Sequence, residues 1–223
     1  SFYHTSWKDR ANSVGVMEQD GTEAIIFLTG MDALHQGVEV EASYRPVDIF
    51  KLDAAVSVGK WVLTDDVSGS YKDYDGGDNT EINFDYYVKD LKVGDAPQTQ
   101  FSLTGTVYPM KGLFGQLVVR YYDNHYAQWD PFGRTNPDDT KQSWMAPAYT
   151  LVDLHASYDL PITFKNTKIS IFAHVFNLLD ATYIQDAVDN SQYNAFDHDH
   201  DADDAEVFFG LPRNFNMGIS VGL

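Results

Sequence analysis

Strict alternation is clearest in Asn214-Phe215-Asn216-Met217-Gly218-Ile219-Ser220-Val221-Gly222-Leu223. Successive side chains of a β-strand point to opposite faces of a sheet, so this period of two predicts one apolar face and one polar face. Similar alternation recurs upstream, and helical periodicity is scarce. The pattern predicts an all-β fold of eight strands, at about residues 2–10, 33–45, 50–64, 98–108, 113–126, 148–159, 166–180 and 211–223.

The connections between these strands alternate in length. Short turns are predicted at 45–49, 109–112 and 160–165, whereas the other connections fill residues 11–32, 65–97, 127–147 and 181–210. Structureless loops of that length are uncommon in compact soluble domains. Short turns at one end, long loops at the other and strands of about ten residues are typical of a transmembrane antiparallel β-barrel of the bacterial outer membrane. A soluble sandwich or a lipocalin-like barrel shows the same alternation and is the alternative.

Aromatic residues favour the membrane interpretation. The chain has 14 Tyr, 14 Phe and 4 Trp, and many lie near predicted strand ends, where the interfacial girdles of a barrel sit. These are Tyr3, Trp7, Tyr44, Phe50, Trp61, Tyr108, Phe114, Tyr121, Tyr122, Tyr126, Tyr149 and Tyr158. The strand faces opposite the apolar ones are polar, as a water-filled lumen requires.

Composition excludes several classes of protein. With 15 Lys+Arg against 33 Asp+Glu, the net charge of −18 argues against a partner with a nucleic-acid backbone. The absence of Cys excludes a disulfide scaffold, a Cys-ligated zinc site and a thiol nucleophile. No apolar run is long enough for a membrane-spanning helix.

More than half of the acidic residues lie in two predicted loops, 65–97 and 180–212, so one rim of the barrel is predicted to be acidic.

One of these acidic loops contains a candidate metal site. Alternating Asp and His offer the oxygen and nitrogen ligands that suit a transition metal, whereas the carboxylates alone suit Ca²⁺. A solvated acidic loop is the plainer interpretation, and no cofactor is required. The candidate ligands are Asp197, His198, Asp199, His200, Asp201, Asp203 and Asp204.

A second candidate site follows the chain from a strand into a loop. Aromatic rings and arginines suit sugars, haem-like ligands or siderophores, so a ligand vestibule is predicted here, partly shared with the aromatic girdle. Its residues are Arg120, Tyr122, His125, Tyr126, Trp129, Phe132 and Arg134. The sequence has no nucleophile elbow, no Gly-rich phosphate loop and no zinc-helix motif, so no catalytic residue is predicted.

Six short stretches follow one another in a characteristic order. They are Phe2–Arg10, which ends in Trp-Lys-Asp-Arg, then Gly37-Val38-Glu39-Val40-Glu41, Ala96–Phe101, Tyr149–Leu154, Phe176-Asn177-Leu178-Leu179-Asp180-Ala181-Thr182-Tyr183, and Phe208-Phe209-Gly210-Leu211-Pro212-Arg213. Over nearly the whole chain they resemble the C-terminal part of TonB-dependent outer-membrane receptors, and the last stretch resembles receptors of the Bacteroidota type. One departure is Leu223, where the family commonly ends in Phe or Trp.

The resemblance implies a 22-stranded barrel of which residues 1–223 supply about the last eight strands. The plug domain and the earlier strands would precede Ser1. Implied partners are outer-membrane lipid, the plug, the remaining strands, the TonB complex and a surface lipoprotein. The long loops would be extracellular and the C-terminus periplasmic. His155 and His174 lie on polar strand faces and would face the lumen, hydrogen-bonded to plug or water, with metal ligation as the alternative.

The implied function is TonB-dependent import of a nutrient: an iron–siderophore, a cofactor, a peptide or a glycan. Two alternatives come from other classes. A complete eight-stranded barrel would act as an adhesin or a structural protein, since eight strands can close. An outer-membrane enzyme would need a catalytic constellation near the loop rim, and only the loop with His198 and His200 offers part of one.

Overall fold

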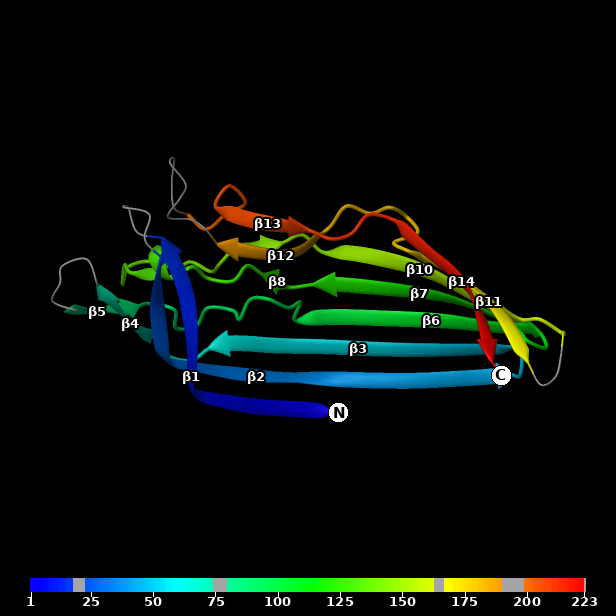
Figure 1. Ribbon diagram of the computed structural model, residues 1–223. Helices are drawn as coiled ribbons and strands as arrows, with labels where there is room; N and C mark the ends of the chain where they lie inside the picture. Colours follow the sequence, from blue (N-terminus) through cyan, green and yellow to red (C-terminus); the bar gives the residue numbers. More distant parts are fainter. Residues whose placement is uncertain (18–22, 74–79, 163–166, 190–198, 223) are drawn as a thin grey trace.

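The computed structural model describes residues 1–17, 23–73, 80–162, 167–189 and 199–222. Its main element is a ten-stranded antiparallel sheet (Figure 1). Eight strands follow one another through this sheet in chain order, as predicted. They are β1 (Phe2–Met17), β2 (Glu23–Val47), β3 (Phe50–Leu63), β6 (Thr99–Met110), β7 (Leu113–Asp123), β10 (Tyr149–Asp159), β11 (Lys168–Phe176) and β14 (Asn214–Gly222).

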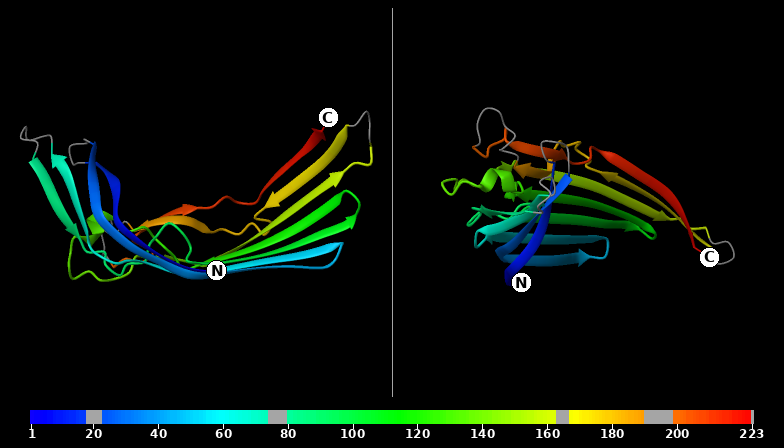
Figure 2. Two further views of the ribbon diagram at one scale, coloured as in Figure 1. Left: turned by 90° about the horizontal axis from the view of Figure 1, so that it is seen from below. Right: turned by 60° about the vertical axis from the view of Figure 1, so that its left-hand side comes forward.

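The sheet curves but does not close (Figure 2). Within the described residues β1 pairs only with β2, and β14 pairs only with β11. The short turns at 48–49 and 111–112 and the connection from β10 to β11 lie at one end, here called the turn end. Residues 163–166 of that last connection lie outside the described residues. The other end, called the loop end, is where β1 joins β2, β3 joins β6, β7 joins β10 and β11 joins β14.

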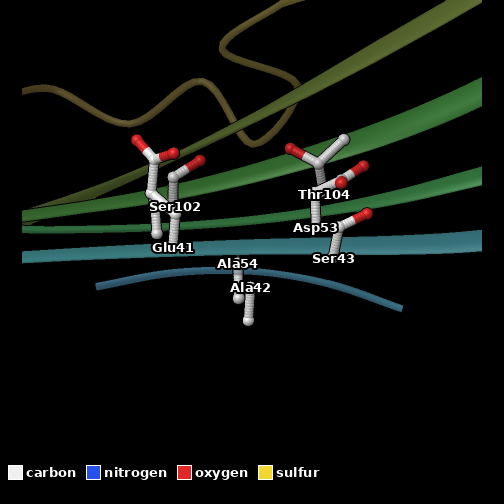
Figure 3. A pocket seen from close by; sticks show the side chains of 8 residues that line it. Glu41, Ala42, Ser43, Asp53, Ala54, Ser102 and Thr104 are labelled. Carbon is white, nitrogen blue, oxygen red and sulfur yellow. The ribbon is translucent and has the colours of Figure 1, made fainter.

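The two faces of the sheet differ as the alternation predicts. In Figure 3 the side chains of Glu41, Asp53 and Ser102 point to one side, whereas the methyl groups of Ala42 and Ala54 point to the other. On the apolar face of β14 the large side chains are 58–74% exposed, a surface that a soluble protein would have to cover. A transmembrane barrel places this face against lipid and the polar face in its lumen.

The long connections are not the structureless loops that the sequence predicts. β1 and β2 extend as a paired hairpin well beyond their predicted ends. The connection between β3 and β6 contains the hairpin β4 (Val67–Asp73) and β5 (Thr80–Tyr86), and the one between β11 and β14 contains β12 (Ile184–Asp189) and β13 (Ala205–Phe209). The connection between β7 and β10 contains β8 (His125–Tyr126), the 3₁₀-helix η1 (Pro131–Arg134) and β9 (Met145–Ala146).

These extra elements enclose the hydrophobic core, which lies at the loop end. Ile26 and Leu28 of β2 are each 2% exposed, whereas Ile25 and Phe27 between them are more than half exposed. The period of two therefore continues through a stretch that reads as one apolar run in the sequence. The buried residues are Ile26, Leu28, Met31, Ala33, Leu63, Val67, Tyr86, Val88 and Leu91.

The predicted interfacial girdle is wrong for part of its aromatic residues. The Tyr3 hydroxyl accepts a hydrogen bond of 2.8 Å from Trp61 Nε1, and its ring crosses Gly37 and Gly59 on the polar face. A Cβ at Gly37 would lie 2.5 Å from the Tyr3 hydroxyl oxygen, so only glycine leaves room for the ring. Alternation assigns a residue to a face of the sheet only where the register is known. A count of aromatic residues near strand ends ignores the register, so it cannot say which face those residues occupy.

Candidate functional site

The polar face carries an ion pair at the centre of the sheet. Arg120 of β7 contacts the carboxylate of Asp153 on β10, and Asp153 is almost fully buried. Asp153 Oδ1 also accepts a hydrogen bond of 2.9 Å from the backbone N–H of Asn177. Two donors therefore hold this carboxylate, and the ion pair fixes where the guanidinium sits on the face.

Three tyrosine rings form a ladder beside this ion pair. The ring centroids of Tyr122 and Tyr149 are 5.0 Å apart, and those of Tyr149 and Tyr183 are 4.7 Å apart. The ladder joins β7, β10 and the segment before β12. A cavity of about 340 Å³ lies against it, lined by Arg120, Leu151, Asp153, Phe176, Asn177, Tyr183, Leu211 and Asn214.

A second hollow lies along the same face. It measures about 460 Å³ and is lined on its polar side by Glu41, Ser43, Asp53, Ser102 and Thr104 (Figure 3). A smaller hollow of about 200 Å³ includes Glu39, Glu41 and Gln100 and reaches Arg120 and Tyr122. The polar face thus offers hydroxyl, amide, carboxylate and guanidinium groups in one continuous row. Such groups can form hydrogen bonds to a polar ligand.

Asn177 explains the role of the stretch Phe176–Tyr183, one of the six that resemble the receptor family. It ends β11 with a φ of 49°, a backbone conformation that Asn tolerates better than most residues. Its side-chain oxygen accepts a 2.9 Å hydrogen bond from Ala181 N–H, and its Nδ2 donates to the carbonyl groups of Ala181 and Leu211. Asp180 Oδ1 accepts a 2.8 Å hydrogen bond from Arg213 N–H. The motif therefore turns the chain out of β11 and fastens it to the start of β14.

A buried network of charges joins two of the long connections. Arg134 at the end of η1 is 1% exposed, and its guanidinium lies 3.3 Å from Asp139 Oδ1 and 3.4 Å from Asp189 Oδ2. The His200 ring lies between the same two acids, with Nδ1 2.7 Å from Asp189 Oδ2 and Nε2 2.6 Å from Asp139 Oδ2. Backbone hydrogen bonds of 2.8 Å between Gln128 and both Ala187 and Asp189 reinforce the junction.

The charges of this network depend on one another. Burial alone would lower the pKa of the His200 imidazole, but its hydrogen bonds to Asp189 and Asp139 outweigh burial and leave the pKa raised. Burial also lowers the pKa of the Arg134 guanidinium, against the attraction of the same two acids. The Arg134 guanidinium and the His200 imidazole face the same two carboxylates, so loss of the guanidinium leaves buried acids without their cationic partner.

His125 has a different environment. Its side chain is 3% exposed, and neither ring nitrogen has a hydrogen-bond partner within the described residues. Burial lowers the pKa of its imidazole, although Asp186 and Asp95 pull in the opposite direction. The neutral ring is therefore the form that the fold favours.

The structure divides the predicted vestibule between two places. Arg120 and Tyr122 lie together on the polar face, where the ion pair and the tyrosine ladder meet. Trp129 packs against Tyr86 beside the hydrophobic core, and Arg134 is buried in the charge network. His125 and Tyr126 form β8, where His125 is buried and Tyr126 is half-buried. Phe132 lies in η1, but its side chain is outside the described residues. Asp153, Tyr149 and Tyr183 belong to the site and were not predicted, because only the register places them beside Arg120 and Tyr122.

The predicted metal ligands are divided as well. Asp197 and His198 lie outside the described residues. One carboxylate oxygen from each of Asp199, Asp201 and Asp204 lies within 4.8 Å of the others, whereas both ring nitrogens of His200 contact Asp189 and Asp139 instead. Asp203 is exposed, and its backbone N–H donates to Asp201 Oδ1. A cation site here stays a prediction, one in which oxygen ligands would dominate.

Comparison with known proteins identifies the family. The described residues form no helix with the length and hydropathy needed to cross a membrane. No curated protein matches the chain. Residues 1–178, well over half of the sequence, match the family model described as TonB dependent receptor-like, beta-barrel. Together with the open, curved antiparallel sheet, this match identifies the chain as a member of the TonB-dependent receptor β-barrel family, whose place is the bacterial outer membrane.

Proposed function

We propose that the chain forms the ligand-facing wall and the capture loops of a receptor that imports a nutrient actively across the outer membrane. The family acts in TonB-dependent transport and is not a family of enzymes. The observation that carries the proposal is the polar face, where Arg120, Asp153 and Tyr183 line one cavity. Tyr122 of the tyrosine ladder lines the smaller hollow beside it. Nutrient classes that suit it are an iron–siderophore, a cofactor, a peptide or a glycan.

The loop end is proposed to be extracellular and the turn end, with the C-terminus, periplasmic. Long connections face outward in outer-membrane barrels, and here they are held in place by the hydrophobic core and the charge network. Because the connections at the loop end are structured, they present a cargo site in a fixed geometry, which lowers the entropic cost of binding. The open edges of β1 and β14 fit further strands of the same barrel, since unpaired backbone groups in lipid cost several kcal/mol each.

The proposed partners follow from the family. A plug domain would fill the lumen against the polar face, and the TonB complex would move it. A surface lipoprotein is a further proposed partner at the loop end. The acidic loops are proposed to hold divalent cations only as an aid to loop structure, and no cofactor takes part in transport.

The test is uptake by cells that make the full receptor containing this chain. A strain lacking the receptor is offered labelled iron–siderophore, cobalamin, haem, peptide and oligosaccharide in turn. We expect uptake of one class to fall, to return with the wild-type receptor, and to stop when a protonophore removes the energy that TonB uses. Unchanged uptake of every class combined with lost adhesion to surfaces would overturn the proposal in favour of a structural or adhesive barrel.

A matched pair of variants connects the uptake to the polar face. Tyr122→Ala removes one ring of the ladder and is expected to lower uptake roughly tenfold, the effect of losing about 1.4 kcal/mol of binding. Tyr158→Ala removes a ring from the apolar face of the neighbouring strand and is expected to leave uptake unchanged. Both are compared at equal amounts of folded receptor, measured by the heat-modified mobility of the barrel on gels. Equal loss of uptake in the two variants would contradict a cargo site on the polar face.

A further inference from the structure

Two histidines face each other across neighbouring strands on the polar face. His155 of β10 and His174 of β11 are direct register partners, and their Nδ1 atoms lie 2.9 Å apart. Their ring centroids are 5.0 Å apart and the ring planes cross at 62°. The nearest described ion pair, between Arg120 and Asp153, uses neither imidazole.

Aromatic neighbours restrict both imidazole rings. The Phe176 ring lies 5.5 Å from His155 and 6.1 Å from His174, and the Phe172 ring lies 5.4 Å from His174. Phe172 itself is packed over Gly218, where a Cβ would lie 2.5 Å from its ring. Because these contacts limit rotation of the side chains, the two nitrogens are held together before any ligand arrives.

The residues in register with the pair on the two flanking strands are polar and uncharged. Gln116 of β7 is the register partner of His155, and Asn216 of β14 is the register partner of His174. Gln116 Nε2 donates a 3.1 Å hydrogen bond to Thr106 Oγ1, which holds the amide side chain on the polar face. Asp153, two residues before His155 on the same face, is occupied by Arg120 and Asn177. Two imidazoles flanked by amides form a nitrogen-rich site, unlike the carboxylates of the loop end.

We propose that His155 and His174 bind one divalent transition-metal ion, of the class of Cu²⁺, Ni²⁺ or Zn²⁺, through their Nδ1 atoms. Metal–nitrogen bonds of about 2.0–2.1 Å place two adjacent ligand nitrogens about 2.9 Å apart at a right angle and about 3.4 Å apart in a tetrahedron. The observed separation matches the right-angled arrangement, which Cu²⁺ and Ni²⁺ favour. The remaining coordination positions face the lumen and are open to water or to a ligand brought by the plug or the cargo.

The same separation also fits a direct hydrogen bond between two neutral imidazoles. In the hydrogen-bonded pair one Nδ1 carries a proton, so metal binding requires that ring to carry its proton on Nε2 instead. The inference does not depend on which nutrient the receptor imports, so it stands or falls separately from the proposed function.

The experiment uses the full receptor purified in detergent without a polyhistidine tag and stripped of metal by a chelator. Cu²⁺ is then titrated, and binding is followed by calorimetry and by electron paramagnetic resonance, where bound imidazole nitrogen splits the copper signal. We expect one Cu²⁺ with two imidazole nitrogens. His155→Ala and His174→Ala should each weaken binding by roughly tenfold or more, because the chelate is lost.

Two controls keep the result interpretable. His4→Ala removes an exposed histidine from β1 and should leave copper binding unchanged, and Asp201→Asn tests the carboxylates at the loop end. Folding of each variant is checked by gel mobility, and His155→Asn and His174→Asn replace any alanine variant that fails to fold. Copper binding that survives the loss of both histidines, that is abolished by Asp201→Asn, or that is absent from the wild type would overturn the proposal.

Discussion

The ring of Tyr183 lies so close to Gly210 that a Cβ at position 210 would be 1.9 Å from the Tyr183 Cζ atom. The backbone confirms the contact, since Gly210 N–H donates a 3.0 Å hydrogen bond to the Tyr183 carbonyl. The ring also packs against Tyr149 of the sheet, at 4.7 Å between centroids and 31° between the ring planes. A single tyrosine thus joins the barrel wall, the segment before β12 and the segment after β13.

Replacing Gly210 by alanine should break this junction. Because the Tyr183 ring packs against Tyr149 and cannot move aside freely, Gly210→Ala is expected to destabilise the loop end by about 1–3 kcal/mol, as other overpacked sites are. The measurement is urea unfolding of the full receptor, followed by protease sensitivity of the loops. Gly105→Ala is the matched control, because nothing lies within 4 Å of the Cβ it would add. Equal stability of the two variants would show that the ring does not hold this segment.

This junction illustrates what the sequence could and could not predict. The alternation around Phe215, Ile219 and Val221 predicts strands, faces and their order, because period and register are local properties. The motif containing Asn177 and Tyr183 predicts the family. Neither predicts that Tyr183 meets Gly210 or that His200 meets Asp139, because those contacts join segments far apart in sequence through connections whose alternation is interrupted. For the same reason the hairpin of β12 and β13 reads as a loop.

The charge network at the loop end should respond strongly to the loss of Arg134. Arg134→Met removes the guanidinium that pairs with Asp139 and Asp189, while His200 still contacts both acids. Breaking a buried pair of this kind is expected to cost about 3–5 kcal/mol. Limited proteolysis of intact cells should then cut the connections around Asp139 and Asp189 much faster, while the barrel stays folded. Lys141→Met, which removes an exposed cation paired with Asp199, is the control and should change little.

The same charge network should make the stability of the connections at the loop end depend on pH. The pKa of His200 is raised in the folded state above its ordinary value of 6.5. Its protonated form therefore contributes stability that is fully present below pH 6.5 and is lost as the pH rises through the folded value. The protection of the loop backbone against hydrogen exchange, relative to the intrinsic exchange rate at each pH, should fall over this range. His125, whose pKa is lowered, acts in the opposite sense, and its contribution is lost as the pH falls below 6.5.

Comparison with His200→Gln isolates the contribution of His200. Glutamine keeps hydrogen-bonding groups near Asp189 and Asp139 but carries no titratable proton. The variant should be less protected against exchange than the wild type at pH 5.5, and its protection should not fall between pH 6 and pH 8, conditions chosen to bracket the ordinary histidine pKa of about 6.5. If the wild type and the variant show the same dependence on pH, a group other than His200 sets the pH dependence of the connections at the loop end.

The two faces of β14 predict opposite effects of one substitution. Ile219 lies on the apolar face and Ser220 on the polar face. Arg at Ile219 should cost about 2–4 kcal/mol, because its charge enters lipid at mid-membrane depth, whereas Ser220→Arg should be much milder. The yield of folded, heat-modifiable receptor in outer membranes measures both. Similar yields of Ile219→Arg and Ser220→Arg would contradict the assigned faces.

The central claim is that this chain is a membrane-spanning wall whose loop end faces outward, and single-cysteine labelling of intact cells tests it most directly. The chain contains no Cys, so Thr140→Cys at the loop end and Lys111→Cys at the turn end are each the only thiol it carries. Both positions are exposed. A membrane-impermeant maleimide should label Thr140→Cys in intact cells and Lys111→Cys only after the outer membrane is opened. Labelling of Lys111→Cys but not Thr140→Cys in intact cells would reverse the topology, and equal labelling of both would contradict a spanning wall.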